Sequence, residues 1–136
     1  SHKLEQLMGV DTWMNATVYA AEKLMSFEGV KDGLRSRDLA LHYFVTGELR
    51  VLTLTKNGVE FTSTDFIGRR PFREAVLRLD RQTSHKLLCQ EITFVQAKNR
   101  KLLTFEGDLV RLSWLLPHFG KACVGYQLAV QSREGA

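Results

Sequence analysis

The chain has 136 residues, of which 44% are hydrophobic and 25% are charged, and its formal net charge is +4. This composition is that of an average globular protein, so it excludes a largely disordered chain, and the length indicates one domain that needs neither disulfides nor a metal to fold. No apolar run approaches the roughly 18 residues of a membrane span, and the chain does not open with a signal-peptide pattern. We therefore predict a cytoplasmic protein that makes no contact with a membrane.

The first segment, residues 4–27, is predicted to be an amphipathic helix. Its apolar residues recur at steps of three and four, which is typical of a helix that buries one face. Two interpretations are open, because this face suits packing on the sheet of the same subunit and packing against a twin helix in a homodimer. We favour self-association, and the residues expected at the dimer contact are Leu7, Met14, Val18 and Met25.

The first strands are predicted between residues 36 and 63. Residues 39–45 fit either a short helix or a strand, and both interpretations remain open. Residues 49–55, LRVLTLT, are predicted to be a strand because they are rich in apolar and β-branched side chains. Asn57 and Gly58 then give the usual signal for a tight hairpin, with residues 59–63 as the returning strand.

Residues 69–81 are predicted to form a second helix. Pro71 suits the first turn of a helix, where its missing N–H group has no partner to lose. Phe72, Val76 and Leu79 follow at the spacing of one buried stripe. We expect this stripe to pack on the sheet and the neighbouring arginines to face solvent.

The last third of the chain is predicted to be strands that pair with their neighbours. Hydrophobic residues alternate with polar ones in residues 87–98 and 122–130. Residues 102–106 and 109–116 are predicted to be two further strands that pair with each other in antiparallel fashion. The sequence therefore predicts an α+β fold. It consists of an antiparallel sheet of about five strands, an N-terminal amphipathic helix and a helix packed on the sheet.

This order of elements resembles that of a PAS domain over residues 38–131. Residues 65–76, DFIGRRPFREAV, are similar to the PAS segment that leads into the core helices, and residues 91–101, 109–117 and 122–130 are similar to the three closing strands. The resemblance implies the strand order 2-1-5-4-3. We therefore predict three parts of the chain, which are an N-terminal helical segment at 1–35, a PAS-like domain at 36–131 and a frayed tail at 132–136.

In a PAS-like sheet the inner face also lines a ligand cavity. The resemblance therefore places a ligand pocket at three aromatic residues of the predicted closing strands, Phe94, Trp114 and Tyr126. It also implies a regulatory domain of the signalling type that commonly dimerises through an added helix.

Basic residues are concentrated in residues 68–101, which hold nine Lys and Arg residues against three acidic ones. Arginine binds phosphate oxygens with two parallel hydrogen bonds, so such a cluster suits a polyanion. An alternative function is therefore a basic nucleic-acid- or polyanion-binding domain that uses residues 69–101. The residues expected to bind the anion are Arg69, Arg70, Arg73, Arg100 and Lys101.

The sequence contains no recognised catalytic or metal-binding motif. His42, His85 and His118 are not paired with one another at ligand spacing, and Cys89 and Cys123 do not form a CxxC pair. We predict no catalytic residue, no metal site and two reduced, buried cysteines, and we name no cofactor. The favoured function is a non-enzymatic regulatory module that senses a ligand or mediates protein–protein contacts, through self-association as a homodimer.

Overall fold

The computed structural model describes residues 2–48, 50–67, 73–107 and 112–134, apart from the side chains of residues 2–13, 66 and 132–134. The described helices are α1 (His2–Met25), α2 (Glu28–Arg37), α3 (Arg81–Leu88), α4 (Phe94–Asn99) and α6 (Phe119–Glu134). The strands are β1 (Ala40–Val45), β2 (Arg50–Thr55), β3 (Gly58–Ser63), β4 (Glu74–Leu79) and β5 (Leu103–Glu106). Two short 3-10 helices are η1 (Thr64–Phe66) and η2 (Leu116–His118).

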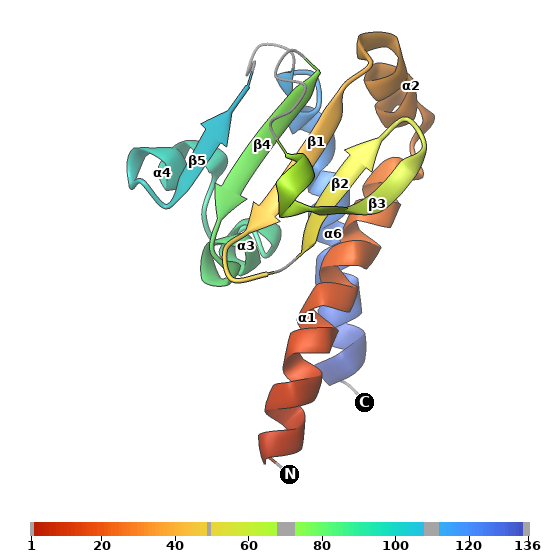
Figure 1. The fold of residues 1–136 in the computed structure, drawn as a ribbon. Helices are drawn as coiled ribbons and strands as arrows, with labels where there is room; N and C mark the ends of the chain where they lie inside the picture. The colour runs from red at the N-terminus through yellow and green to blue at the C-terminus, as the bar shows by residue number, and fades with distance from the viewer. Residues whose placement is uncertain (1, 49, 68–72, 108–111, 135–136) are drawn as a thin grey trace.

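The five strands form one mixed sheet in the order β3-β2-β1-β4-β5 (Figure 1). β1 and β4 are parallel, and the other neighbours are antiparallel. The prediction of an α+β fold with a sheet of about five strands is confirmed. The sheet is mixed because β4, the next strand after β3 in the chain, lies on the other side of β1 and runs parallel to it. This order also differs from the one that the PAS resemblance implied.

Side chains along each strand alternate between the two faces of the sheet, as the pleat requires. Leu41 and Tyr43 of β1 face the helices, together with their cross-strand partners Leu54 and Leu52 of β2. His42 lies between them on the opposite, outer face, and both faces contain buried residues.

The outer face buries a chain of polar side chains. His42 Nε2 lies 2.7 Å from a carboxylate oxygen of Glu74, and His42 Nδ1 lies 2.8 Å from Thr53 Oγ1. Thr53 Oγ1 in turn lies 2.8 Å from Thr62 Oγ1. The chain therefore links β4, β1, β2 and β3 through side chains as well as through the backbone.

α1 and α6 lie side by side and antiparallel on the inner face of the sheet, so that both ends of the chain leave at the same end of the molecule (Figure 1). Small residues allow this close approach. Ala16, Ala20 and Ala122 are buried, and a Cβ atom at Gly125 would come within 2.9 Å of Lys23 Cγ.

No described helix combines the length and the apolar character that a membrane span requires.

The predicted helix over residues 69–81 is wrong, because its described part begins with the strand β4. β4 lies between β1 and β5, and its apolar residues are buried on both faces of the sheet. A short strand that buries apolar residues on both faces cannot be distinguished by sequence periodicity from a buried helical segment. Val76 and Leu79 are buried as expected, whereas Phe72 lies outside the described residues.

Three of the predicted closing strands are also wrong. Residues 87–98 contain the end of α3 and most of α4, and residues 122–130 belong to α6. The described part of 109–116 forms a turn that leads into η2. The strand predicted at 102–106, the N-terminal helix, the first hairpin and its turn are confirmed, and the open segment 39–45 is the strand β1.

Candidate ligand-binding cavity

An apolar cavity of about 240 Å³ lies between the inner face of the sheet and the helices that cover it. The sheet contributes large side chains, which are Leu41, Tyr43, Leu52, Leu54, Leu77, Leu103 and Phe105. The helices and their connections contribute Thr17, Ala20, Ala21, Leu24, Leu88, Phe94, Val95, Lys98, Leu112, Leu115, Leu116, Phe119 and Ala122.

The cavity exists because small side chains on the two long helices face large ones on the sheet. Ala20 and Ala21 of α1 and Ala122 of α6 line it, and a methyl group fills less of the space than a larger side chain would. Well-packed protein interiors contain few voids larger than a water molecule. A cavity of this size is therefore a specific feature of the fold and exceeds the small voids of an ordinary protein interior.

The mouth of the cavity lies beside α4 and η2. Val95 of α4 and Leu116 of η2 both line the cavity and are exposed to solvent, by 68% and 52% respectively. Exposed apolar side chains at the rim of an apolar cavity favour the entry of an apolar molecule, because the molecule passes from one apolar surface to another.

Few polar groups reach the cavity. Among the described lining residues Lys98 is the one that carries a charge, and it is exposed, so its ammonium group belongs to the mouth. Tyr43 presents a neutral hydroxyl that is hydrogen-bonded to Ser84 Oγ. Burial raises the pKa of Tyr43 well above its usual value. These walls suit an apolar chain with at most one anionic or polar end.

Of the three residues predicted to contact a ligand, Phe94 lines this cavity and packs edge-on against Phe119, with the ring centroids 4.6 Å apart. Trp114 instead packs on α2, where a Cβ atom at Gly33 would come within 2.5 Å of its ring. Tyr126 is buried on α6 and lies against α3 rather than among the lining residues. The structure therefore does not bring the three aromatic residues together.

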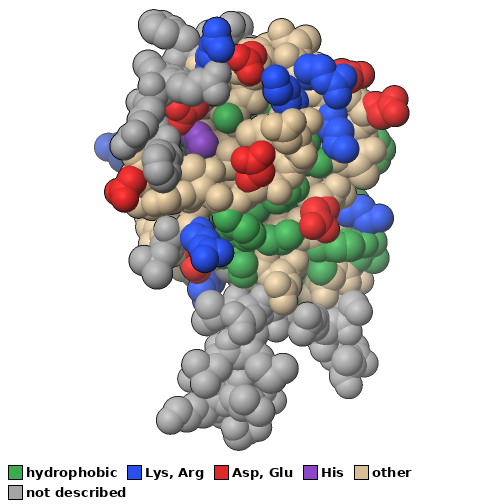
Figure 2. Space-filling view, turned by 45° about the vertical axis from the view of Figure 1, so that its right-hand side comes forward, with side chains coloured by type: hydrophobic (Ala, Val, Ile, Leu, Met, Phe, Trp, Pro, Cys, Tyr) green, Lys and Arg blue, Asp and Glu red, His purple; other side chains and the backbone are tan. Residues whose placement is uncertain are grey.

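The residues predicted for a dimer helix lie on α1. Met25 is buried, and Met14 and Val18 are partly buried and pack against the core of the same chain; the side chain of Leu7 is not described. Figure 2 shows a patch of exposed hydrophobic side chains flanked by charged ones, and exposed hydrophobic residues include Tyr19 of α1 and Phe61 of β3. The homodimer stays a prediction.

The basic residues predicted to bind an anion are only partly described. Arg69 and Arg70 lie outside the described residues, and Arg73 is exposed and pairs with Asp38 at 2.7 Å. Arg100 and Lys101 are exposed on the turn between α4 and β5. β4 and β5 are antiparallel, so this turn lies near the end of β4 opposite Arg73, and β4 is about 20 Å long. The described members therefore do not form one cluster.

Sequence reasoning missed most of the cavity-lining residues. Leu41, Leu52, Leu54 and Leu77 are visible in the sequence as strand residues, but nothing local distinguishes a wall of a cavity from a filled core. Ala20, Ala21 and Ala122 carry the only signal, since small residues on a buried helical face reduce the filled volume. That signal can be interpreted only once α1 is known to pack against α6, and residues 122–130 of α6 were predicted to be a strand.

No family model matches the chain, and no curated protein matches it. Solved structures do resemble it. TT1886 from Thermus thermophilus, a conserved hypothetical protein and suggested sterol carrier protein, has a TM-score of 0.51 and 15% sequence identity over 85% of this chain and 86% of its own. The apo form of sterol carrier protein 2 from Yarrowia lipolytica has a TM-score of 0.50 and 9% identity over 79% of this chain and 87% of its own.

These similarities correct the PAS interpretation. The neighbours are sterol carrier protein structures rather than PAS domains, and the observed strand order departs from the PAS order. The PAS-like domain and the signalling role that depended on it are therefore wrong. At these identities the similarity concerns the fold alone, and the chain shares the fold of the sterol carrier protein 2 structures.

Proposed function

We propose that the protein is a non-enzymatic binding module that holds one lipid-like molecule in the cavity between the sheet and the helices. The observation that carries this proposal is the cavity of about 240 Å³ with almost wholly apolar walls and an apolar mouth. For comparison, an engineered apolar cavity of about 150 Å³ in another protein binds benzene. The two sterol carrier protein structures with the same fold support the proposal.

The ligand is proposed to enter with its apolar chain first and to leave its polar end near Lys98. The deep walls offer leucine, alanine and phenylalanine side chains, which gain free energy from contact with an alkyl chain. A carboxylate or phosphate would be costly to bury among them but would remain solvated beside the ammonium group of Lys98. An anionic amphiphile therefore fits both ends of the site.

Replacing Lys98 with alanine is expected to weaken the binding of oleate about twofold to fivefold while leaving the binding of oleyl alcohol unchanged. The two molecules share an alkyl chain, and only oleate gains from a nearby cation, which at an exposed site contributes up to about 1 kcal/mol. The measurement is displacement of the fluorescent fatty acid cis-parinaric acid from the purified, delipidated protein. Lys86→Ala is the matched control, because Lys86 is exposed and does not line the cavity.

The outcomes separate the two parts of the proposal. If neither competitor displaces cis-parinaric acid in a saturable way, the protein does not hold a lipid-like ligand and the proposed function is wrong. If both compete and Lys98→Ala binds oleate as well as Lys86→Ala does, the cavity binds ligand but Lys98 does not receive its polar end.

A further inference from the structure

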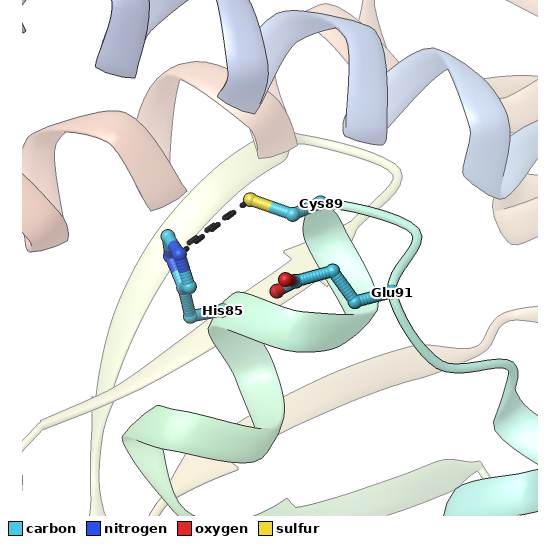
Figure 3. A group of neighbouring side chains, drawn as sticks. All are labelled: His85, Cys89 and Glu91. Carbon is cyan, nitrogen blue, oxygen red and sulfur yellow. Dashed lines mark hydrogen bonds between the residues drawn. The ribbon is translucent and has the colours of Figure 1, made fainter.

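Three potential metal ligands meet at the C-terminal end of α3 (Figure 3). The ligand atoms of His85, Cys89 and Glu91 all lie within 4.8 Å of one another. His85 and Glu91 are exposed and Cys89 is partly buried, so an ion in solution can reach the group. None of the three lines the cavity, although Leu88 between them does. The cluster is thus separate from the proposed lipid site.

The backbone explains why the three side chains converge. Residues 85 and 89 are one helical turn apart, so their side chains share a face of α3. Gln90 then adopts the left-handed conformation, with φ of 62°. The Glu91 N–H donates to the Lys86 carbonyl at 2.8 Å and the Gln90 N–H to the Leu87 carbonyl at 3.1 Å. These two bonds are a Schellman motif, which turns the chain back and brings Glu91 beside the helical pair (Figure 3).

The distances suit a tetrahedral metal ion. Cys89 Sγ lies 3.6 Å from His85 Nε2. A zinc ion bound at about 2.3 Å from sulfur and about 2.0 Å from nitrogen, with a tetrahedral angle, separates these two atoms by about 3.5 Å. The pair therefore stands close to the required separation before any ion is added.

The other nitrogen of the imidazole is held by a buried partner. His85 Nδ1 lies 2.6 Å from the hydroxyl oxygen of Tyr126, which is buried on α6. When Nδ1–H donates to this oxygen, Nε2 keeps its lone pair for a metal ion, and Cys89 Sγ lies beside the ring, 3.6 Å from Nε2 and 3.9 Å from Nδ1. Histidines that bind metals almost always donate their second N–H in this way, which fixes the tautomer and the orientation of the ring.

We propose that His85 Nε2, Cys89 Sγ and the Glu91 carboxylate bind one Zn²⁺ ion, with water in the fourth position. A set of one sulfur, one imidazole nitrogen and one carboxylate oxygen is a ligand set that zinc accepts. This proposal does not depend on the lipid-binding function. Since the three residues join the end of α3 to the turn that follows, the bound ion would also fix that turn.

Cobalt(II) is the probe for this site because, unlike zinc, it reports its ligands by absorption. The 136-residue chain, stripped with a chelator and kept reduced, is expected to bind one Co²⁺. The complex should show a thiolate-to-cobalt charge-transfer band in the near ultraviolet and the visible bands of tetrahedral cobalt. Adding one equivalent of Zn²⁺ is expected to abolish both signals. Zn²⁺ is also expected to slow the alkylation of Cys89, and Cys123 interferes little because burial raises the pKa of its thiol to about 11.

Single variants assign the ligands. Cys89→Ser is expected to remove the charge-transfer band, and His85→Ala and Glu91→Gln to weaken Co²⁺ binding at least about tenfold. Tyr126→Phe, which removes only the partner of Nδ1, is expected to keep the stoichiometry and to weaken the affinity about tenfold. His118→Ala and Glu106→Gln are the matched controls, since neither residue belongs to the cluster. Circular dichroism of each metal-free variant checks that it is folded.

The proposal is overturned if the folded wild-type chain shows no stoichiometric cobalt band. It is also overturned if the band survives in Cys89→Ser, or if His118→Ala weakens binding as much as His85→Ala does. Unchanged affinity in Glu91→Gln would equally contradict the three-residue site.

Discussion

Replacing Glu74 with alanine is expected to lower the free energy of unfolding by about 3 kcal/mol. Glu74 and His42 are both buried and lie 2.7 Å apart through a carboxylate oxygen and Nε2. Removing one partner of a buried hydrogen bond leaves the polar group of the other without that partner in a site largely shielded from solvent. The loss of Glu74 should also weaken the contacts of β2 and β3, because the same imidazole contacts Thr53, which in turn contacts Thr62 of β3.

Urea unfolding followed by circular dichroism measures this change. Glu106→Ala is the matched control, because Glu106 also pairs with a cation on the outer face, Arg78 at 3.1 Å, but the Arg78 side chain is 36% exposed and that of Glu106 is 59% exposed. An exposed pair contributes at most about 1 kcal/mol. Equal losses in Glu74→Ala and Glu106→Ala would show that the buried chain of polar side chains does not stabilise the sheet.

Replacing Ala122 with phenylalanine is expected to reduce the affinity for cis-parinaric acid at least about tenfold, which corresponds to about 1.4 kcal/mol of binding free energy. Ala122 is buried on α6 and lines the cavity, so a larger side chain occupies the volume proposed for the ligand. The cost in stability should be smaller than in a filled core, where added volume typically costs about 1–3 kcal/mol, since the ring enters existing space.

Val124→Phe controls for the added ring. Val124 lies on the same helix but is 57% exposed and does not line the cavity, so this variant is expected to bind the probe as the wild type does. Fluorescence titration of both variants, with their thermal midpoints, makes the comparison. A folded Ala122→Phe protein that binds as tightly as Val124→Phe would place the probe somewhere other than the cavity.

The sequence was informative where local signals agreed with tertiary packing. The apolar steps of α1, the β-branched content of β2 and the Asn57–Gly58 turn predicted the correct elements. The α+β class and the number of strands followed from these. The strand order did not follow, because a parallel neighbour requires a crossover that residue patterns along a strand do not record.

The errors in the second half have specific causes. α4 begins with a capping box in which Thr93 and Gln96 exchange hydrogen bonds, a signal that is visible in the sequence but was outweighed by alternating apolar residues. In α6, Val124 and Leu128 are exposed although they are apolar. Together with the neighbouring apolar residues they give the alternating pattern that is typical of a strand. The apolar side chains of α6 at these two positions lie outside the core, where periodicity does not report on burial.

The same errors hid the candidate sites. Residues 85 and 89 are adjacent only on a helix, and with residues 87–98 predicted as a strand the sulfur had no nearby imidazole along the chain. The cavity could not be predicted because its walls come from elements far apart in sequence, and one of its main helices was predicted to be a strand.

The most direct test of lipid binding in the cavity is methyl NMR of the leucine side chains during titration with oleate. We predict saturable shifts at leucines that line the cavity, such as Leu54, Leu77 and Leu103, and little change at Leu34 and Leu87, which are buried but do not line it. Shifts confined to the exposed Leu128, or no saturable shift at any leucine, would contradict the account.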